Sequence, residues 1–200
     1  MNIKEYEIVK DFSYLQYCDY LQEKYGIGLC NYMTKSWNKN PKISRSKDGL
    51  FVHHKYEDHA ILLSNKNAAM RNPFEWQLAE NMVYCDYLEH LFLHILICEN
   101  PANDKNKFEA VGIGGVFIIV STLNDFYSGW NTEKLLWMQT CLNKVCKDKD
   151  VYLTLLKRFK NNCGKHPKFT DDCLFRSCNA QLGTWEYENN RALFEEIANL

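Results

Sequence analysis

The chain has 200 residues, of which 46% are hydrophobic and 24% charged, and its 24 Lys and Arg residues nearly balance 25 Asp and Glu residues. This composition excludes a disordered chain and a strongly basic nucleic-acid coat. The first dozen residues mix charges, and the longest apolar run, 110–120, is shorter than the roughly 20 residues that span a bilayer. With nine cysteines, an odd number, we expect a cytoplasmic protein with reduced thiols and no membrane segment.

The first half of the chain predicts a helix, an irregular arm and a hairpin. Apolar residues recur three or four apart over 4–25, which is helical spacing. A basic stretch rich in Asn and Ser follows over 31–50 and predicts an extended or irregular arm. The segments 50–55 and 60–64 are short, partly β-branched or aromatic, and separated by the polar residues YEDH, so together they predict a β-hairpin.

The second half is predominantly helical by its pattern. After a polar connection around Pro73, Asp86 is suited to cap a helix that continues to Cys98. Four further segments have helical patterns: 108–127, 132–146, 150–160 and 190–200. Within the first of them, the glycines of GIGG at 112–115 indicate close helix packing, because the phosphate-binding Lys-Ser/Thr pair is missing.

These elements predict an α+β fold in which a small strand–strand–helix unit is set among helices. No repeat or linker marks a second domain, so we expect a single domain. Its parts are an N-terminal helix and basic arm over 1–48, a central unit over 49–99 and a helical extension over 100–200.

The histidines are distributed unevenly, with five of the six falling within 42 residues. His90 and His94 are four apart on a predicted helix, which is the spacing at which two imidazoles share a metal ion. His53 and His54 are adjacent on a predicted strand and so point to opposite faces. One of this pair can therefore bind a metal while the other accepts a proton, and His59 has no matching role.

The order of these residues resembles that of the HNH, or ββα-metal, endonucleases. The resemblance covers about 50 residues, from Gly49 to Cys98, and consists of a His-His pair, Asn81, and a helix with His-x-x-x-His. It is closest to the colicin DNase version, in which Asn precedes the first helical histidine by nine residues, as Asn81 precedes His90 here. The long gap before Asn81 implies an enlarged loop, and the missing counterpart of an accompanying acidic residue leaves the ligand set open.

The resemblance implies a metal-dependent endonuclease that hydrolyses phosphodiester bonds in nucleic acid, with DNA favoured because most relatives cut DNA. In that family pattern His54 corresponds to the general base that activates water. His53, His90 and His94 correspond to ligands of one divalent metal ion. Asn81 corresponds to a residue that holds the loop or the base in place and that contacts the metal in some relatives.

The residue types indicate which metal ions the site would favour and which basic residues could contact phosphate. Three imidazole nitrogens suit Zn, Ni, Co or Mn better than Mg, whereas a site using Asn81 and water would move this balance toward Mg. Arg45 and Lys47 precede the His-His pair and are candidates to hold a phosphate, although a solvated basic stretch is an equal interpretation. From 35 to 71 there are eight Lys or Arg against three acidic residues, which favours docking of a polyanion.

Other interpretations stay open. Glu57 and Asp58 have two interpretations. In one, a carboxylate orients His54 or one of the metal ligands; in the other, both are simply residues of the hairpin turn. A rival function is a noncatalytic nucleic-acid or protein-binding module in which the histidines hold a structural zinc. A second rival is a helical interaction protein without metal. A closed site with four protein ligands would favour the structural zinc, and an open site with His54 unliganded would favour the nuclease.

Overall fold

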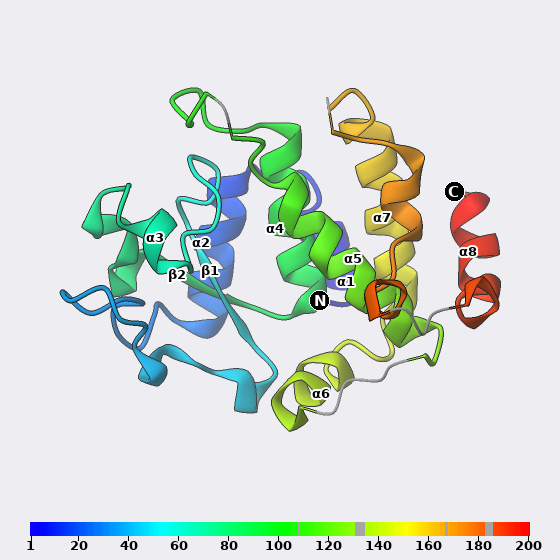
Figure 1. Ribbon diagram of the computed structural model, residues 1–200, viewed down its shortest axis with the longest axis horizontal. Coiled ribbons are helices and arrows are strands. Elements are labelled where there is room, and N and C mark those ends of the chain that lie inside the picture. Colours follow the sequence, from blue (N-terminus) through cyan, green and yellow to red (C-terminus); the bar gives the residue numbers. More distant parts are fainter. Residues whose placement is uncertain (108, 131–134, 167, 183–185) are drawn as a thin grey trace.

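The computed structural model describes all residues except 108, 131–134, 167 and 183–185. The described part of the chain contains eight α-helices and one antiparallel pair of short strands, which confirms a mostly helical α+β fold (Figure 1). The helices are α1 (Ile3–Val9), α2 (Tyr14–Tyr25), α3 (Lys66–Ala69), α4 (Tyr87–Glu99), α5 (Ile113–Tyr127), α6 (Leu136–Asn143), α7 (Lys149–Cys163) and α8 (Arg191–Ala198), and the strands are β1 (Phe51–His54) and β2 (Met82–Cys85).

The N-terminal helical pattern divides into two helices, α1 and α2. Ser13 ends the break between them, because its side chain accepts a hydrogen bond from the Gln16 backbone while the Gln16 side chain accepts one from the Ser13 backbone. This capping box fixes the start of α2 immediately before Tyr14. The arm after α2 contains only isolated bridges and short 3-10 turns, as its composition predicted.

The predicted hairpin between 50–55 and 60–64 is wrong. β1 pairs instead with β2, with Phe51 opposite Cys85 and His54 opposite Met82, so the order is strand, loop, strand, helix. The segment 60–64 forms turns, and Leu62 has a φ of 59°, which interrupts an extended strand. All four residues of β2 are buried, so β2 lacks the polar alternation by which a half-exposed strand is recognised.

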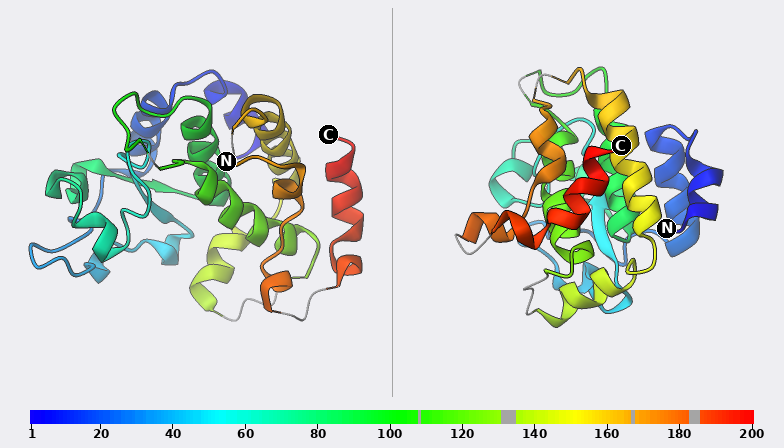
Figure 2. Two further views of the ribbon diagram at one scale, coloured as in Figure 1. Left: turned by 45° about the horizontal axis from the view of Figure 1, so that its top comes forward. Right: turned by 90° about the vertical axis from the view of Figure 1, so that its right-hand side faces the viewer.

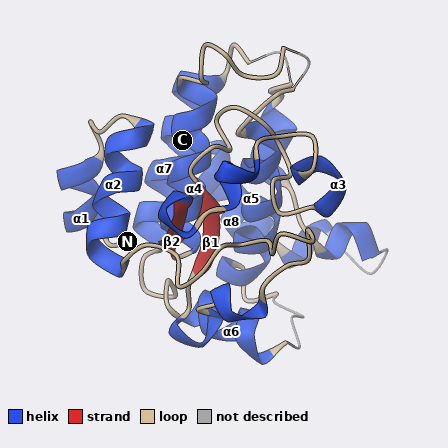
Figure 3. Cartoon of the chain, turned by 90° about the vertical axis from the view of Figure 1, so that its left-hand side faces the viewer, coloured by secondary structure: helices blue, strands red, loops and turns tan. Residues whose placement is uncertain are grey.

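The two strands separate a large hydrophobic core from a small one. Figure 3 shows the strands side by side among the helices. Because side chains alternate along a strand, Phe51 and Val83 pack with the large core, whereas Val52 and Met82 pack with the small one. The large core is formed mainly by α1, α2, α4, α5 and α7. The small core gathers the arm and the long loop around Tyr32.

α4 runs through the centre of the molecule and packs against α2, α5 and α7 (Figure 1). Two of the three GIGG glycines, Gly112 and Gly115, permit its close approach to α5: a Cβ on Gly112 would lie 2.8 Å from the His94 carbonyl oxygen, and a Cβ on Gly115 would overlap the His94 ring. The packing interpretation of this motif is therefore confirmed. Figure 2 shows α8 at the end of the molecule opposite the strands. Within the described residues, none of the helices combines the length and hydropathy that crossing a membrane requires.

Candidate metal centre

Two histidines of the centre come from the first half of α4. Asp86 caps this helix by accepting a hydrogen bond from the Glu89 backbone, and the Glu89 side chain accepts one from the Asp86 backbone, so the helix begins at Tyr87. His90 and His94 then lie one turn apart on one face, with their Nε2 atoms separated by 3.1 Å. The helical His pair predicted from the sequence is thus present, and its lone pairs meet in one small space.

His53 joins this pair from β1. Its ring centroid lies 5.3 Å from that of His90 and 5.1 Å from that of His94. One nitrogen from each of the three rings can be chosen so that all three atoms lie within 4.8 Å of one another. His53 is completely buried and His94 is 6% exposed, while His90 keeps a partly exposed ring. These three residues can hold one metal ion.

His54 lies outside this group of three. Strand alternation turns its ring toward the small core, where it contacts the Tyr32 ring at a centroid distance of 4.4 Å. Its Nε2 lies 3.2 Å from the side-chain oxygen of Gln77, and Gln77 in turn donates to the Leu63 carbonyl. His54 is also completely buried. The adjacent histidines therefore have different surroundings, as the strand pattern predicted.

Glu57 lies between the group of three histidines and His54, and its carboxylate approaches both. Its backbone NH donates to the His54 carbonyl oxygen at 3.0 Å, so a tight turn after β1 returns the chain toward the histidines. Oε2 of Glu57 then lies 3.5 Å from His53 Nδ1 and 3.6 Å from His94 Nε2, while Oε1 lies 3.5 Å from His54 Nδ1. Glu57 is thus a turn residue and also a carboxylate of the centre, whereas Asp58 turns away and contacts His59 at 2.6 Å.

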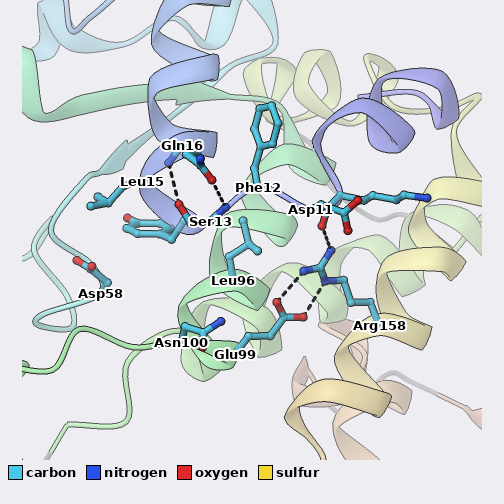
Figure 4. Close-up of a pocket in the computed structure, with 12 residues that line it drawn as sticks. Asp11, Phe12, Ser13, Leu15, Gln16, Asp58, Leu96, Glu99, Asn100 and Arg158 are labelled. Atoms are coloured by element: carbon cyan, nitrogen blue, oxygen red, sulfur yellow. Dashed lines mark hydrogen bonds and ion pairs between the residues drawn. The ribbon is translucent and has the colours of Figure 1, made fainter.

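Tyr14, at the start of α2, contacts the centre from the other side. Its hydroxyl lies 2.8 Å from His53 Nε2 and 3.1 Å from the Lys55 carbonyl oxygen, to which it can donate. When the hydroxyl donates to Lys55, it accepts from His53 Nε2, which leaves the Nδ1 lone pair directed at Glu57 and the ligand space. Tyr14 also lines a cavity of about 550 Å³, which reaches the Glu99–Arg158 ion pair (Figure 4).

The electrostatics of the centre suit a cation. Burial lowers the pKa of His53 to about 3 and also lowers the pKa values of His90 and His94, so the rings are neutral at pH 7, as metal ligands must be. Burial by itself would raise the pKa of Glu57, but the charge of its histidine neighbours, when they are protonated, outweighs burial and lowers it. A divalent ion held by the imidazoles would lower the pKa of this carboxyl group in the same way.

Unsatisfied nitrogen atoms point to the same conclusion. Among the described residues, the Nδ1 atoms of His53, His54 and His94 are buried without a hydrogen-bond partner. Buried polar groups without a partner are costly and need an explanation. For His53 a metal ion would provide one, because its Nδ1 faces the space shared with His94 and Glu57. The donor set and the orphaned atom thus fit a divalent ion.

The other predicted site residues lie around this centre and not in it. Asn81 donates from its side chain to the Glu75 carbonyl at 2.7 Å, and its own carbonyl accepts from the Lys55 backbone, so it fastens the long loop to the end of β1. Arg45 is engaged with Asp48 and with the Tyr25 carbonyl. Lys47 is exposed on the adjacent 3-10 turn.

Sequence reasoning did not find Tyr14 or Gln77, because both reach the histidines through tertiary packing. Gly115 on α5 was assigned to packing without its partner: a Cβ at this position would overlap the His94 ring. Glu57 had a local signal, since a carboxylate three residues after a His-His pair returns to it when the strand ends in a tight turn.

No family model, no curated protein and no solved structure matches the chain.

Proposed function

We propose that the protein is a metal-dependent endonuclease that hydrolyses phosphodiester bonds in nucleic acid, with DNA as the favoured substrate. The supporting observation is the convergence of His53, His90 and His94 on a strand–strand–helix unit, with His54 next to them but outside the ligand group. This is the division between ligands and a separate histidine that the HNH resemblance implies. No disulfide joins any of the nine cysteines, all of which are described, in keeping with a cytoplasmic location.

In this proposal His53, His90 and His94 hold one divalent ion. When bound, the ion would supply Lewis-acid stabilisation of phosphoryl charge, worth several kcal/mol. Nitrogen ligands favour Zn, Ni, Co or Mn over Mg. Neutral imidazoles would leave the charge of the ion available to the phosphate, while the partly exposed His90 marks the side from which a substrate would approach.

His54 is the proposed base, and a base of this kind contributes typically ~10²- to 10⁴-fold. Its ring is buried, and its Nδ1 lies 3.5 Å from Glu57, whose side chain keeps 18% of its exposure. Glu57 is therefore the group that connects His54 to the open side of the centre. Asn81 would hold the loop that covers His54, and Arg45 and Lys47 would contact phosphates flanking the cut.

The test is cleavage of supercoiled plasmid, single-stranded DNA and RNA by the purified chain. Each reaction is run with EDTA and with Zn, Ni, Co, Mn or Mg. We expect metal-dependent nicking that His94→Ala abolishes. His166→Ala is the matched control, because His166 lies on the loop after α7, away from the ligand group. Equal cutting by His94→Ala and the unaltered chain would refute the proposal.

A noncatalytic binding module with a structural zinc is the second candidate. It is favoured by the burial of His53 and His94 and by the carboxylate of Glu57 beside them, since closed four-ligand sites are typical of structural zinc. This alternative predicts stoichiometric zinc and a large loss of thermal stability on its removal, with no cleavage of any nucleic acid.

A further inference from the structure

The position of the Glu57 carboxylate bears on the number of protein ligands in the metal centre. Three measured separations describe the space: 3.1 Å between the Nε2 atoms of His90 and His94, 3.5 Å from Glu57 Oε2 to His53 Nδ1, and 3.6 Å from the same oxygen to His94 Nε2. Glu57 Oε2 therefore lies nearly as close to His53 Nδ1 and to His94 Nε2 as His90 Nε2 lies to His94 Nε2.

These separations match the edges of a small coordination polyhedron. Ligands of a tetrahedral ion at bond lengths of about 2.0–2.2 Å lie about 3.3–3.5 Å apart. The two measured edges of Glu57 and the edge between His90 and His94 agree with this range to within about 0.3 Å. The edges between His53 and the helical pair are at most 4.8 Å, so binding of an ion would draw His53 toward the pair if they exceed the range.

We propose that Glu57 is the fourth protein ligand, binding through Oε2 and completing a site of three imidazoles and one carboxylate. The proposal rests on the metal centre of the proposed function and adds a carboxylate to the three histidines that the HNH resemblance implies. With four protein ligands the site would be closed, as in the structural-zinc candidate, so in the endonuclease a phosphate would have to enter as a fifth ligand. A carboxylate would reduce the charge of a divalent ion held by neutral imidazoles by one unit. It would also give the site the mixed nitrogen and oxygen donors common for Zn, Co and Mn.

The second oxygen of Glu57 contacts His54, and this contact suggests what His54 does at the centre. Oε1 lies 3.5 Å from His54 Nδ1, and the other nitrogen of His54 is held by Gln77. When its ring carries both protons, His54 donates from Nε2 to the Gln77 oxygen and from Nδ1 to Glu57 Oε1. The second contact would orient the carboxylate so that Oε2 faces the ion, as groups behind metal ligands commonly do. His54 is thus a positioning residue for the fourth ligand, whether or not it also acts in hydrolysis.

Metal binding by the full chain tests the proposal directly. Zinc affinity is measured by competition with a chromophoric chelator, and coordination is read from the visible absorption of the Co(II) form. Glu57→Gln keeps the shape of the side chain and removes its charge, and Asp58→Asn is the matched control because the Asp58 carboxylate contacts His59 and not the ligand group. Circular dichroism of each metal-free variant verifies folding, and Glu57→Asp replaces Glu57→Gln if the latter does not fold.

We expect Glu57→Gln to bind zinc at least tenfold more weakly and to change the Co(II) spectrum, while Asp58→Asn does neither. His54→Gln should weaken zinc binding less than Glu57→Gln does, since it removes an orienting contact and not a ligand. Unchanged affinity and an unchanged Co(II) spectrum in Glu57→Gln, with binding lost in His94→Ala, would overturn the fourth ligand and leave the metal centre intact. Weakened zinc binding by Glu57→Gln in a chain that cuts no nucleic acid would support this inference and refute the endonuclease.

Discussion

Two neighbouring glycines of α5 offer a sharp test of the packing behind the metal centre. Gly114 and Gly115 both lie in the first turn of the helix and differ in what surrounds them. A Cβ on Gly114 would meet no atom within 4 Å, whereas a Cβ on Gly115 would overlap the His94 ring at its Cε1, Nδ1 and Nε2 atoms. Gly115→Ala should therefore displace one ligand, and Gly114→Ala should not.

The magnitudes follow from opposing effects of the added methyl group. Replacing Gly by Ala within a helix stabilises it by up to about 1 kcal/mol, so Gly114→Ala should raise the free energy of unfolding by about 0–1 kcal/mol. At Gly115 the same gain is opposed by overpacking, which costs about 1–3 kcal/mol. The two variants should thus differ by about 1–3 kcal/mol in the metal-free protein. Displacement of His94 should also weaken zinc binding about tenfold or more, which is about 1.4 kcal/mol.

Urea unfolding in the presence of EDTA measures the first difference, and zinc titration measures the second. The pair controls for helix propensity, because the chemical change and the helical turn are the same. Equal zinc affinities for the two variants would refute the reasoning that Gly115 holds the His94 ring in place. So would a more stable metal-free Gly115→Ala protein, because the overlap requires that either the ring or the helix move.

Other changes give further expected outcomes. Loss of a ligand in His94→Ala should lower zinc affinity and the thermal midpoint of the zinc-loaded chain together, and unchanged zinc stoichiometry would remove that residue from the site. Tyr14→Phe removes the hydroxyl 2.8 Å from His53 Nε2 and should weaken zinc binding about 10- to 100-fold, measured by chelator competition. At saturating metal concentration, His54→Gln should abolish plasmid cleavage with the fold preserved, and wild-type cutting would exclude it as the base. In EDTA, stability should fall as the pH drops from 6.5 toward about 3, because burial lowers the pKa of His53 to about 3 and the unfolded chain takes up the proton first. Each buried histidine contributes up to about 1.4 kcal/mol per pH unit, which urea unfolding at pH 7.5, 6.5 and 5.5 would detect.

The three candidate ligand histidines could be predicted from the sequence because their placement depends on the repeats of a helix and a strand. A four-residue spacing puts His90 and His94 on one helical face, and the Asp86 cap fixes where that helix begins. A two-residue period sends His53 toward the helix and His54 away from it. Neither inference needed the strand partner, so the wrong hairpin did not disturb the group of three histidines.

The strand partner itself depends on information that the local pattern lacks. β2 is four residues long and buried on both faces, so its composition resembles that of any short apolar run. The competing segment 60–64 has similar residues, but it forms turns in which Leu62 has a φ of 59°, so it does not extend as a strand. Tyr14 and Gly115 likewise contribute through the packing of α2 and α5, which lie far from the motif in sequence.

Glu57 shows how the two kinds of information combine at this centre. Strand alternation separates His53 from His54, and the turn after β1 then returns a single carboxylate to both rings. One oxygen faces the ligand space while the other faces the buried histidine, so any change at His54 should be transmitted to the ion through Glu57. A mutation of His54 that impairs cleavage therefore identifies a base only if zinc affinity and the Co(II) spectrum are unchanged. Loss of both would instead identify His54 as the residue that orients the fourth ligand.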